Sequence, residues 1–110
     1  MLKTETVLRI RDTGIMAIVR VENMERGTEI AQACLDGGVD VLEISYTLDN
    51  AGEIISGLSK EFGDKILIGA GTVLDSETAR LAILSGAKFV IAPNFNKQVA
   101  LLCNRYQIAY

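Results

Sequence analysis

The stretch Gly37-Gly38-Val39-Asp40-Val41-Leu42-Glu43-Ile44-Ser45 decides the fold that we expect for this chain. Paired glycines are typical of the end of a helix, and an apolar run follows them directly. Side chains of a strand alternate in direction, so Leu42 and Ile44 face one side of a sheet and the residues between them face the other. Apolar residues on both faces are typical of a parallel strand that is covered on both sides.

Short apolar runs recur along the chain at a spacing of about 25 residues, as expected for a repeated unit of one strand and one helix. Each run is followed by a segment in which apolar residues recur at helical spacing. The expected strands are Ile15–Val19, Val39–Ile44, Ile66–Ile68 and Phe89–Ala92, and Ile108–Tyr110 begins a fifth. The expected helices are Leu2–Thr13, Met24–Asp36, Ala51–Phe62, Glu77–Ser85 and Lys97–Tyr106.

Residues that start and stop helices separate these segments. Asn and Asp side chains accept hydrogen bonds from the free N–H groups at a helix N-terminus, and glycine favours the left-handed turn that follows a helix. The expected N-caps are Asn23, Asn50, Asp75 or Ser76, and Asn96, and the expected glycines after helices are Gly37-Gly38, Gly63 and Gly86. Alternating strands and helices predict parallel pairing through right-handed crossovers, with helices covering the sheet.

This alternation predicts an α/β fold in which residues 1–110 form a single domain. Four complete βα units and an N-terminal helix make up half of a TIM (β/α)₈ barrel. A flavodoxin-like open sheet shows the same alternation, and the repeats alone do not exclude it. The residues at the ends of the strands must therefore decide between the two.

Composition excludes several classes of protein. Hydrophobic residues make up 49% of the 110 residues and charged residues 23%, which favours a packed core over disorder. A net charge of −3 without a basic run disfavours nucleic-acid binding, and no apolar stretch is long enough for a membrane span. The chain has no histidine, and Cys34 and Cys103 lie in helical apolar patterns as small hydrophobic residues, so we expect no metal and no cofactor. Because Met1–Glu5 lacks the layout of a signal peptide, we expect a soluble, cytoplasmic protein.

Polar residues lie where the expected strands end. Burial would raise the pKa of Glu43 and suit it to act as a general base, although a structural ion pair is an equal alternative. Glycines before Thr72 would let a ligand approach the backbone, or would simply make a tight turn. Arg20 could bind an anion or lie solvated. The residues that converge on this edge are Arg20, Glu43, Ser45, Thr72 and Pro93. Because barrel enzymes carry their chemistry at the C-terminal ends of strands, this convergence predicts an active site.

Four runs in order make the chain recognisable. It resembles the KDPG (2-keto-3-deoxy-6-phosphogluconate) aldolase / 4-hydroxy-2-oxoglutarate aldolase family along essentially its whole length. The supporting runs are Met16–Arg20, Gly37–Ser45, Ile68–Leu74 and Ser85–Pro93. The resemblance implies a (β/α)₈ barrel and a lyase that cleaves a 2-keto acid to pyruvate and an aldehyde through a lysine Schiff base.

The resemblance also assigns roles to individual residues. Glu43 matches the family's general acid/base glutamate, and Thr72 matches a threonine that helps to hold the substrate carboxylate. Pro93 matches a proline that shapes the pocket floor, and Arg20 aligns with an arginine of some members. Many members carry an arginine where this chain has Thr47, so the grip on the carboxylate differs here and Arg20 is a candidate to replace that arginine.

Family members are longer than this chain, and their Schiff-base lysine and phosphate-binding loops match no residue here. None of the lysines present (Lys3, Lys60, Lys65, Lys88 and Lys97) is in a position expected for the nucleophile. We therefore expect a fragment or one part of a split barrel, with the reactive lysine outside these 110 residues. The resemblance also implies a homo-oligomer, a trimer in many members, with a small 2-keto acid as substrate.

Two other functions stay open from the sequence. The chain could be a catalytically inactive half-barrel or assembly module that associates through its open sheet edges. It could also belong to another phosphate-handling barrel, such as an isomerase or a thiamine-phosphate-type synthase, because glycine-rich turns recur in barrels.

Overall fold

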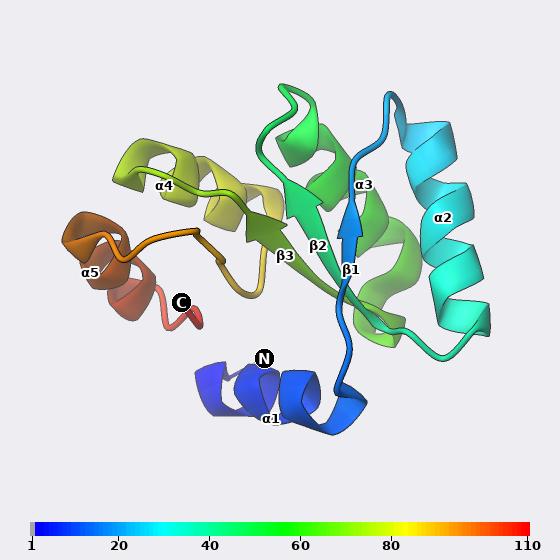
Figure 1. The fold of residues 1–110 in the computed structure, drawn as a ribbon, viewed down its shortest axis with the longest axis horizontal. Coiled ribbons are helices and arrows are strands. Elements are labelled where there is room, and N and C mark those ends of the chain that lie inside the picture. Colours follow the sequence, from blue (N-terminus) through cyan, green and yellow to red (C-terminus); the bar gives the residue numbers. More distant parts are fainter. Residues whose placement is uncertain (1) are drawn as a thin grey trace.

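The computed structural model describes residues 2–110, and it consists of a small parallel sheet with helices packed around it (Figure 1). The strands are β1 (Ala17–Val19), β2 (Val41–Ser45) and β3 (Leu67–Gly71). The helices are α1 (Lys3–Thr13), α2 (Met24–Asp36), α3 (Ala51–Phe62), α4 (Ser76–Ser85) and α5 (Lys97–Arg105), with a short 3₁₀ turn η1 (Gly63–Lys65) after α3. This is the α/β alternation that the sequence predicts.

The sheet has the strand order β1-β2-β3, and both pairs of neighbours are parallel. The register places Ile18 beside Glu43 and Glu43 beside Gly69. Further along, Ser45 lies beside Gly71. Parallel strands joined by helices bring all three C-terminal ends to one edge of the sheet, as the upward arrows of β1 and β2 show in Figure 1.

The two faces of the sheet carry separate apolar clusters, which confirms the expected alternation in β2. Leu42 and Ile44 belong to the larger cluster, which they form with buried residues of the covering helices such as Ile55. Val41 faces the other way and packs in a second, smaller cluster with Leu67 and Phe89. Glu43 lies on the face of this second cluster.

The expected fourth and fifth strands are shorter than the sequence indicates. Instead of a strand over Phe89–Ala92, the chain makes two isolated parallel bridges, Ala70 with Val90 and Phe89 with Ala109. The apolar run is as expected, but only single residues form the bridges because the chain turns away at Pro93. The segment Ile108–Tyr110 likewise contributes only the bridge at Ala109.

Most of the expected helix caps are confirmed. Asn23, Asp75 and Asn96 each accept a hydrogen bond from the backbone N–H three residues later. Asn50 lies at the expected N-cap position of α3, but the prediction that its side chain caps this helix is wrong. Its amide group instead donates to the carbonyl oxygens of Val21 and Glu22, both at 3.1 Å, so it joins the β1–α2 connection to the start of α3.

Helix α1 lies across the N-terminal ends of the strands, at the bottom of Figure 1. Near its C-terminal end, Arg9 donates to two carbonyl oxygens of η1, both at 2.9 Å, and to the Asp40 carboxylate at 3.2 Å. Near its start, Lys3 donates to the side-chain oxygen of Asn104 in α5 at 2.7 Å. One helix is therefore bound both to the start of the sheet and to the last helix. Within residues 2–110, no helix is long and apolar enough to span a membrane.

Candidate active site

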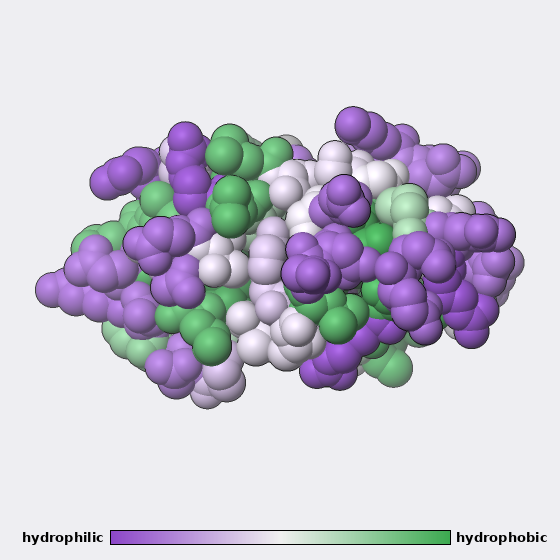
Figure 2. Space-filling view, turned by 90° about the horizontal axis from the view of Figure 1, so that it is seen from above, coloured by the Kyte–Doolittle hydropathy of each residue, from purple (hydrophilic) through white to green (hydrophobic). Residues whose placement is uncertain are grey.

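The three strands place polar side chains at their shared C-terminal edge. Arg20 directly follows β1, and Thr72 directly follows β3. Ser45 ends β2, and Thr47 lies two residues beyond it. Seen from above in Figure 2, the molecule carries pale and hydrophobic residues near the middle of this edge, with hydrophilic residues gathered at both sides.

Glu43 is the only carboxylate among the buried residues of the described chain, with an exposed fraction of 7%. Gly71 on the neighbouring strand makes room for it, because a Cβ atom at residue 71 would overlap the carboxyl group and would lie 2.5 Å from Glu43 Cγ. Burial raises the pKa of Glu43 above its ordinary value, and the positive charge of Arg20 partly offsets that increase. A carboxyl group with a raised pKa is suited to accepting and returning a proton near neutral pH.

Three hydroxyl groups lie beside Glu43 along the strand ends, and we call Ser45, Thr47 and Thr72 the hydroxyl row. The Ser45 Oγ atom lies 2.9 Å from Thr47 Oγ1 and 3.4 Å from Thr72 Oγ1. It also accepts a hydrogen bond from the Thr47 backbone N–H at 3.3 Å. At the outer end of the row, Arg20 Nε donates to Thr47 Oγ1 at 3.3 Å. Four residues from three strand ends thus form one connected polar group.

Sequence reasoning placed Ser45 at this edge but gave it no role. Its central position was unexpected, since serine is small and lies at the end of an apolar strand. The signal in the sequence is a hydroxyl residue two positions after a buried glutamate, which places both side chains on the same face of the strand.

Thr72 adopts the left-handed backbone conformation, with φ at +55°. This conformation is uncommon for any residue other than glycine and is a true outlier for a β-branched side chain. Such backbone strain concentrates at binding and catalytic sites, where the surrounding structure holds it in place. Here it directs the chain out of β3 immediately after the glycine that accommodates Glu43.

Pro93 is not part of this connected group. It is exposed and lines a separate, shallow hollow of about 440 Å³ together with Ile91, Phe95 and Tyr110. The Tyr110 hydroxyl accepts a hydrogen bond from the Asn96 backbone N–H at 2.9 Å and donates to the carbonyl of Asn94, and so fixes the loop that contains Pro93.

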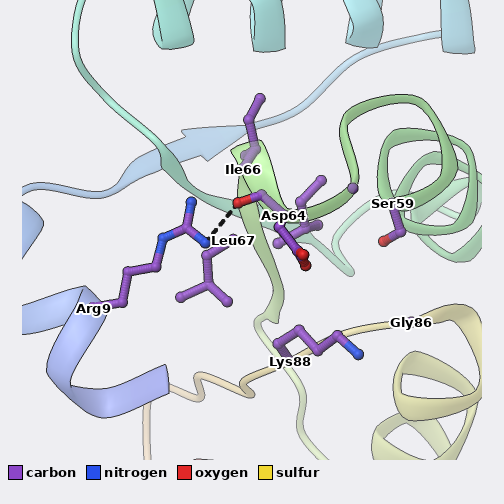
Figure 3. A pocket seen from close by; sticks show the side chains of 9 residues that line it. Arg9, Ser59, Asp64, Ile66, Leu67, Gly86 and Lys88 are labelled. Atoms are coloured by element: carbon purple, nitrogen blue, oxygen red, sulfur yellow. Dashed lines mark hydrogen bonds between the residues drawn. The ribbon is translucent and has the colours of Figure 1, made fainter. Parts of the chain in front are cut away.

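A further cavity of about 260 Å³ lies at the opposite end of the strands (Figure 3). Its lining includes Arg9, Ser59 and Lys88. The Arg9 guanidinium group is already engaged by carbonyl oxygens of η1, one of which is the marked bond to Asp64 in Figure 3. Lys88 lies just before the bridge residues Phe89 and Val90. It is therefore remote from Glu43, as the sequence predicts.

Comparison with known proteins identifies the family. The family model for KDPG and KHG (4-hydroxy-2-oxoglutarate) aldolases matches residues 7–110. The chain belongs to this aldolase family.

Individual relatives agree with this membership. The chain is similar to the 2-dehydro-3-deoxy-phosphogluconate aldolase of Treponema pallidum, with 35% identity over 90% of this chain and 45% of the relative. In structure it is similar to a 4-hydroxy-2-oxoglutarate/2-dehydro-3-deoxyphosphogluconate aldolase from TTHB1, with a TM-score of 0.83 and 25% identity over 96% of this chain and 51% of that one. It also resembles the KDPG aldolase of Legionella pneumophila, with a TM-score of 0.80 and 26% identity over 86% of this chain and 45% of that one. This aldolase-family chain therefore spans about half the length of the relatives it matches.

Proposed function

We propose that this chain carries the acid/base half of a lyase site that cleaves 2-keto-3-deoxy-6-phosphogluconate or 4-hydroxy-2-oxoglutarate to pyruvate and an aldehyde. The observation that carries the proposal is Glu43, a buried carboxylate beside Arg20 and the hydroxyl row, in a chain of the aldolase family. A raised pKa allows Glu43 to take up a proton and return it within one turnover.

In the proposed reaction, a lysine amine adds to the substrate C2 carbonyl, and loss of water gives an iminium ion. Glu43 removes the proton of the C4 hydroxyl group as the C3–C4 bond breaks and the aldehyde leaves. The resulting enamine is protonated at C3, and water then releases pyruvate and regenerates the amine. The solved Legionella relative is described with pyruvate captured as a covalent carbinolamine, which supports the same chemistry here.

The surrounding residues would hold the substrate. Arg20 and Thr72 are proposed to bind the carboxylate next to the reacting carbonyl, since a guanidinium group and a hydroxyl group both donate to carboxylate oxygens. Thr47 contributes by holding Arg20 at 3.3 Å. Pro93 is proposed to shape the pocket floor where the substrate extends away from Glu43.

The proposal places the reactive lysine outside these 110 residues. Lys88 lies at the other end of the strands, and Lys3 is bound to Asn104 at the same end. We further propose that residues 1–110 form one domain, that its βα units are part of a TIM (β/α)₈ barrel, and that the enzyme is a cytoplasmic homo-oligomer, such as a trimer.

Borohydride trapping with pyruvate, read by intact mass, tests this proposal. An adduct on a species heavier than 11.9 kDa supports the lysine mechanism with an external nucleophile. An adduct at 11.9 kDa contradicts the placement of the lysine, because one of the five present here must then react. The absence of any adduct on a heavier species that contains this chain contradicts the lyase proposal.

In an active protein, Glu43→Gln keeps the size of the side chain but removes the proton acceptor. We expect turnover to fall about 10²- to 10⁴-fold, the usual contribution of a general acid/base. Turnover equal to that of the wild type would show that Glu43 is a structural carboxylate.

A second candidate function is a catalytically inactive assembly module. The observation that favours it is Ile18, which lies beside Glu43 in the register and leaves 58% of its side chain exposed on the sheet face. Ile18 belongs to β1, which lies at the edge of the sheet order β1-β2-β3, and an exposed apolar side chain on an edge strand favours association. Sedimentation distinguishes the two functions: concentration-dependent association without pyruvate trapping supports the module, and a monomer excludes it.

A further inference from the structure

The hydroxyl row contains a residue that has no assigned role, Ser45. Its side chain is fully buried, yet its oxygen is the centre of the polar group, within hydrogen-bonding distance of both other hydroxyls. A buried serine at the end of an apolar strand costs free energy unless its hydroxyl group is paired, so its partners matter to its presence there.

Counting protons restricts the row to two directions, of which one leaves a donor for a ligand. Arginine has donors and no acceptor, so Thr47 Oγ1 must accept from Arg20 Nε. Ser45 Oγ already accepts from the Thr47 backbone N–H. In this direction the Thr47 hydroxyl donates to Ser45, and Ser45 donates to Thr72. This uses the hydroxyl protons of Thr47 and Ser45 and both acceptor positions of Ser45.

In this arrangement the Thr72 proton is left free to point into the site. An anion bound beside Thr72 selects this direction, since the reverse direction would use the Thr72 proton for Ser45. Hydrogen bonds in such a chain polarise one another, and the Arg20 charge lies at its donor end. The Ser45–Thr72 distance of 3.4 Å is long for a hydroxyl pair, and catalytic hydrogen bonds of this kind often tighten only when ligand binds.

We propose that Ser45 is a positioning residue, whose hydroxyl group orients Thr47 and Thr72 and, through Thr47, aims the Arg20 guanidinium group at the substrate carboxylate. Among residues 2–110, the Nη groups of Arg20 donate no hydrogen bond, so they are free to bind both oxygens of a carboxylate. This inference rests on the proposed function. It adds an explanation of how Arg20 is positioned to bind the substrate carboxylate in a chain that has threonine at position 47.

The test measures pyruvate binding by calorimetry in the full protein, without a reducing agent. Thr47→Val removes one hydroxyl from an exposed residue of the same shape, and Thr47→Ser retains the hydroxyl. We expect the Kd for pyruvate to rise about tenfold in Thr47→Val and in Ser45→Ala, and to stay near the wild-type value in Thr47→Ser. Ser59→Ala, a hydroxyl loss at the opposite end of the strands, serves as the control and leaves the Kd unchanged.

A double-mutant cycle separates positioning from a structural effect. If Thr47 acts through Arg20, as the proposal requires, Thr47→Val raises the Kd by less than about twofold in the background of Arg20→Met. A tenfold increase that persists in this background overturns the inference, as does wild-type binding by Thr47→Val. Absence of pyruvate binding by the wild-type protein refutes the proposed function itself, whereas normal wild-type binding with unaffected variants refutes only the role of Ser45.

Discussion

Gly71→Ala is the smallest change that should separate Glu43 from its site. The added methyl group would overlap the Glu43 carboxyl group and lie 2.5 Å from its Cγ atom, closer than side-chain carbons approach one another. Glu43 must therefore rotate away or the strands must separate. We expect turnover to fall about 10²- to 10⁴-fold through loss of the general acid/base, and overpacking to cost about 1–3 kcal/mol of unfolding free energy.

Gly69→Ala provides a matched control on the same strand and the same face. There the atoms nearest to the methyl group would be ring carbons of Phe89, which it would overlap. We expect a comparable loss of stability, again about 1–3 kcal/mol, with turnover per folded molecule close to the wild-type value. Urea denaturation measures the first quantity, and initial rates at saturating substrate measure the second.

The double variant Glu43→Gln/Gly71→Ala makes the comparison decisive. If Gly71 acts only by accommodating Glu43, the double variant turns over no more slowly than the worse single variant. Additive losses, or a folded Gly71→Ala variant with wild-type turnover, would refute the reasoning.

Three other predictions follow from the structure. Because burial raises the pKa of Glu43 above its ordinary value of 4.5, this carboxyl group stabilises the folded protein below pH 4.5. That stabilisation is lost as the pH rises through the pKa of Glu43 in the folded state. Glu43→Gln should therefore gain stability relative to wild type as the pH rises above 4.5, measured by urea denaturation; a difference that is constant with pH would contradict this. Arg9→Met should lose about 1–3 kcal/mol because it removes the hydrogen bonds of a charged group, whereas the exposed Arg11→Met should change stability by less than about 0.5 kcal/mol. The buried Tyr46 hydroxyl makes no hydrogen bond within the described residues, so Tyr46→Phe should leave thermal stability unchanged or raise it, and a clear loss would reveal a partner such as the nearby Ser85.

The sequence was sufficient to predict which residues meet at the edge of the sheet. Once β2 and β3 are recognised as parallel strands, Glu43 and Thr72 must lie at the same end, whatever the details of packing. Helices α2 and α3 were also predicted with their observed bounds, because the apolar spacing agrees there with the Asn residue before each helix and the glycine after it.

Contacts that depend on side-chain reach could not be predicted in this way. The bond between Arg20 and Thr47 joins two different strand ends and requires a particular rotamer of a long side chain. Asn50 was expected to cap its own helix, but a bond to a neighbouring segment is equally available to an amide group. The left-handed backbone at Thr72 is unfavourable for threonine, so no local propensity could indicate it.

Helix α1 has a mechanical consequence for the distant site. Arg9 bonds it to the turn before β3, and Lys3 bonds it to α5. The helix therefore connects these two parts of the fold at the N-terminal ends of the strands. We expect these hydrogen bonds to resist changes in the spacing of the elements that they join. We therefore expect α1, which contributes no residue to the site, to limit how far the strand ends that carry Arg20, Glu43 and Thr72 can move apart.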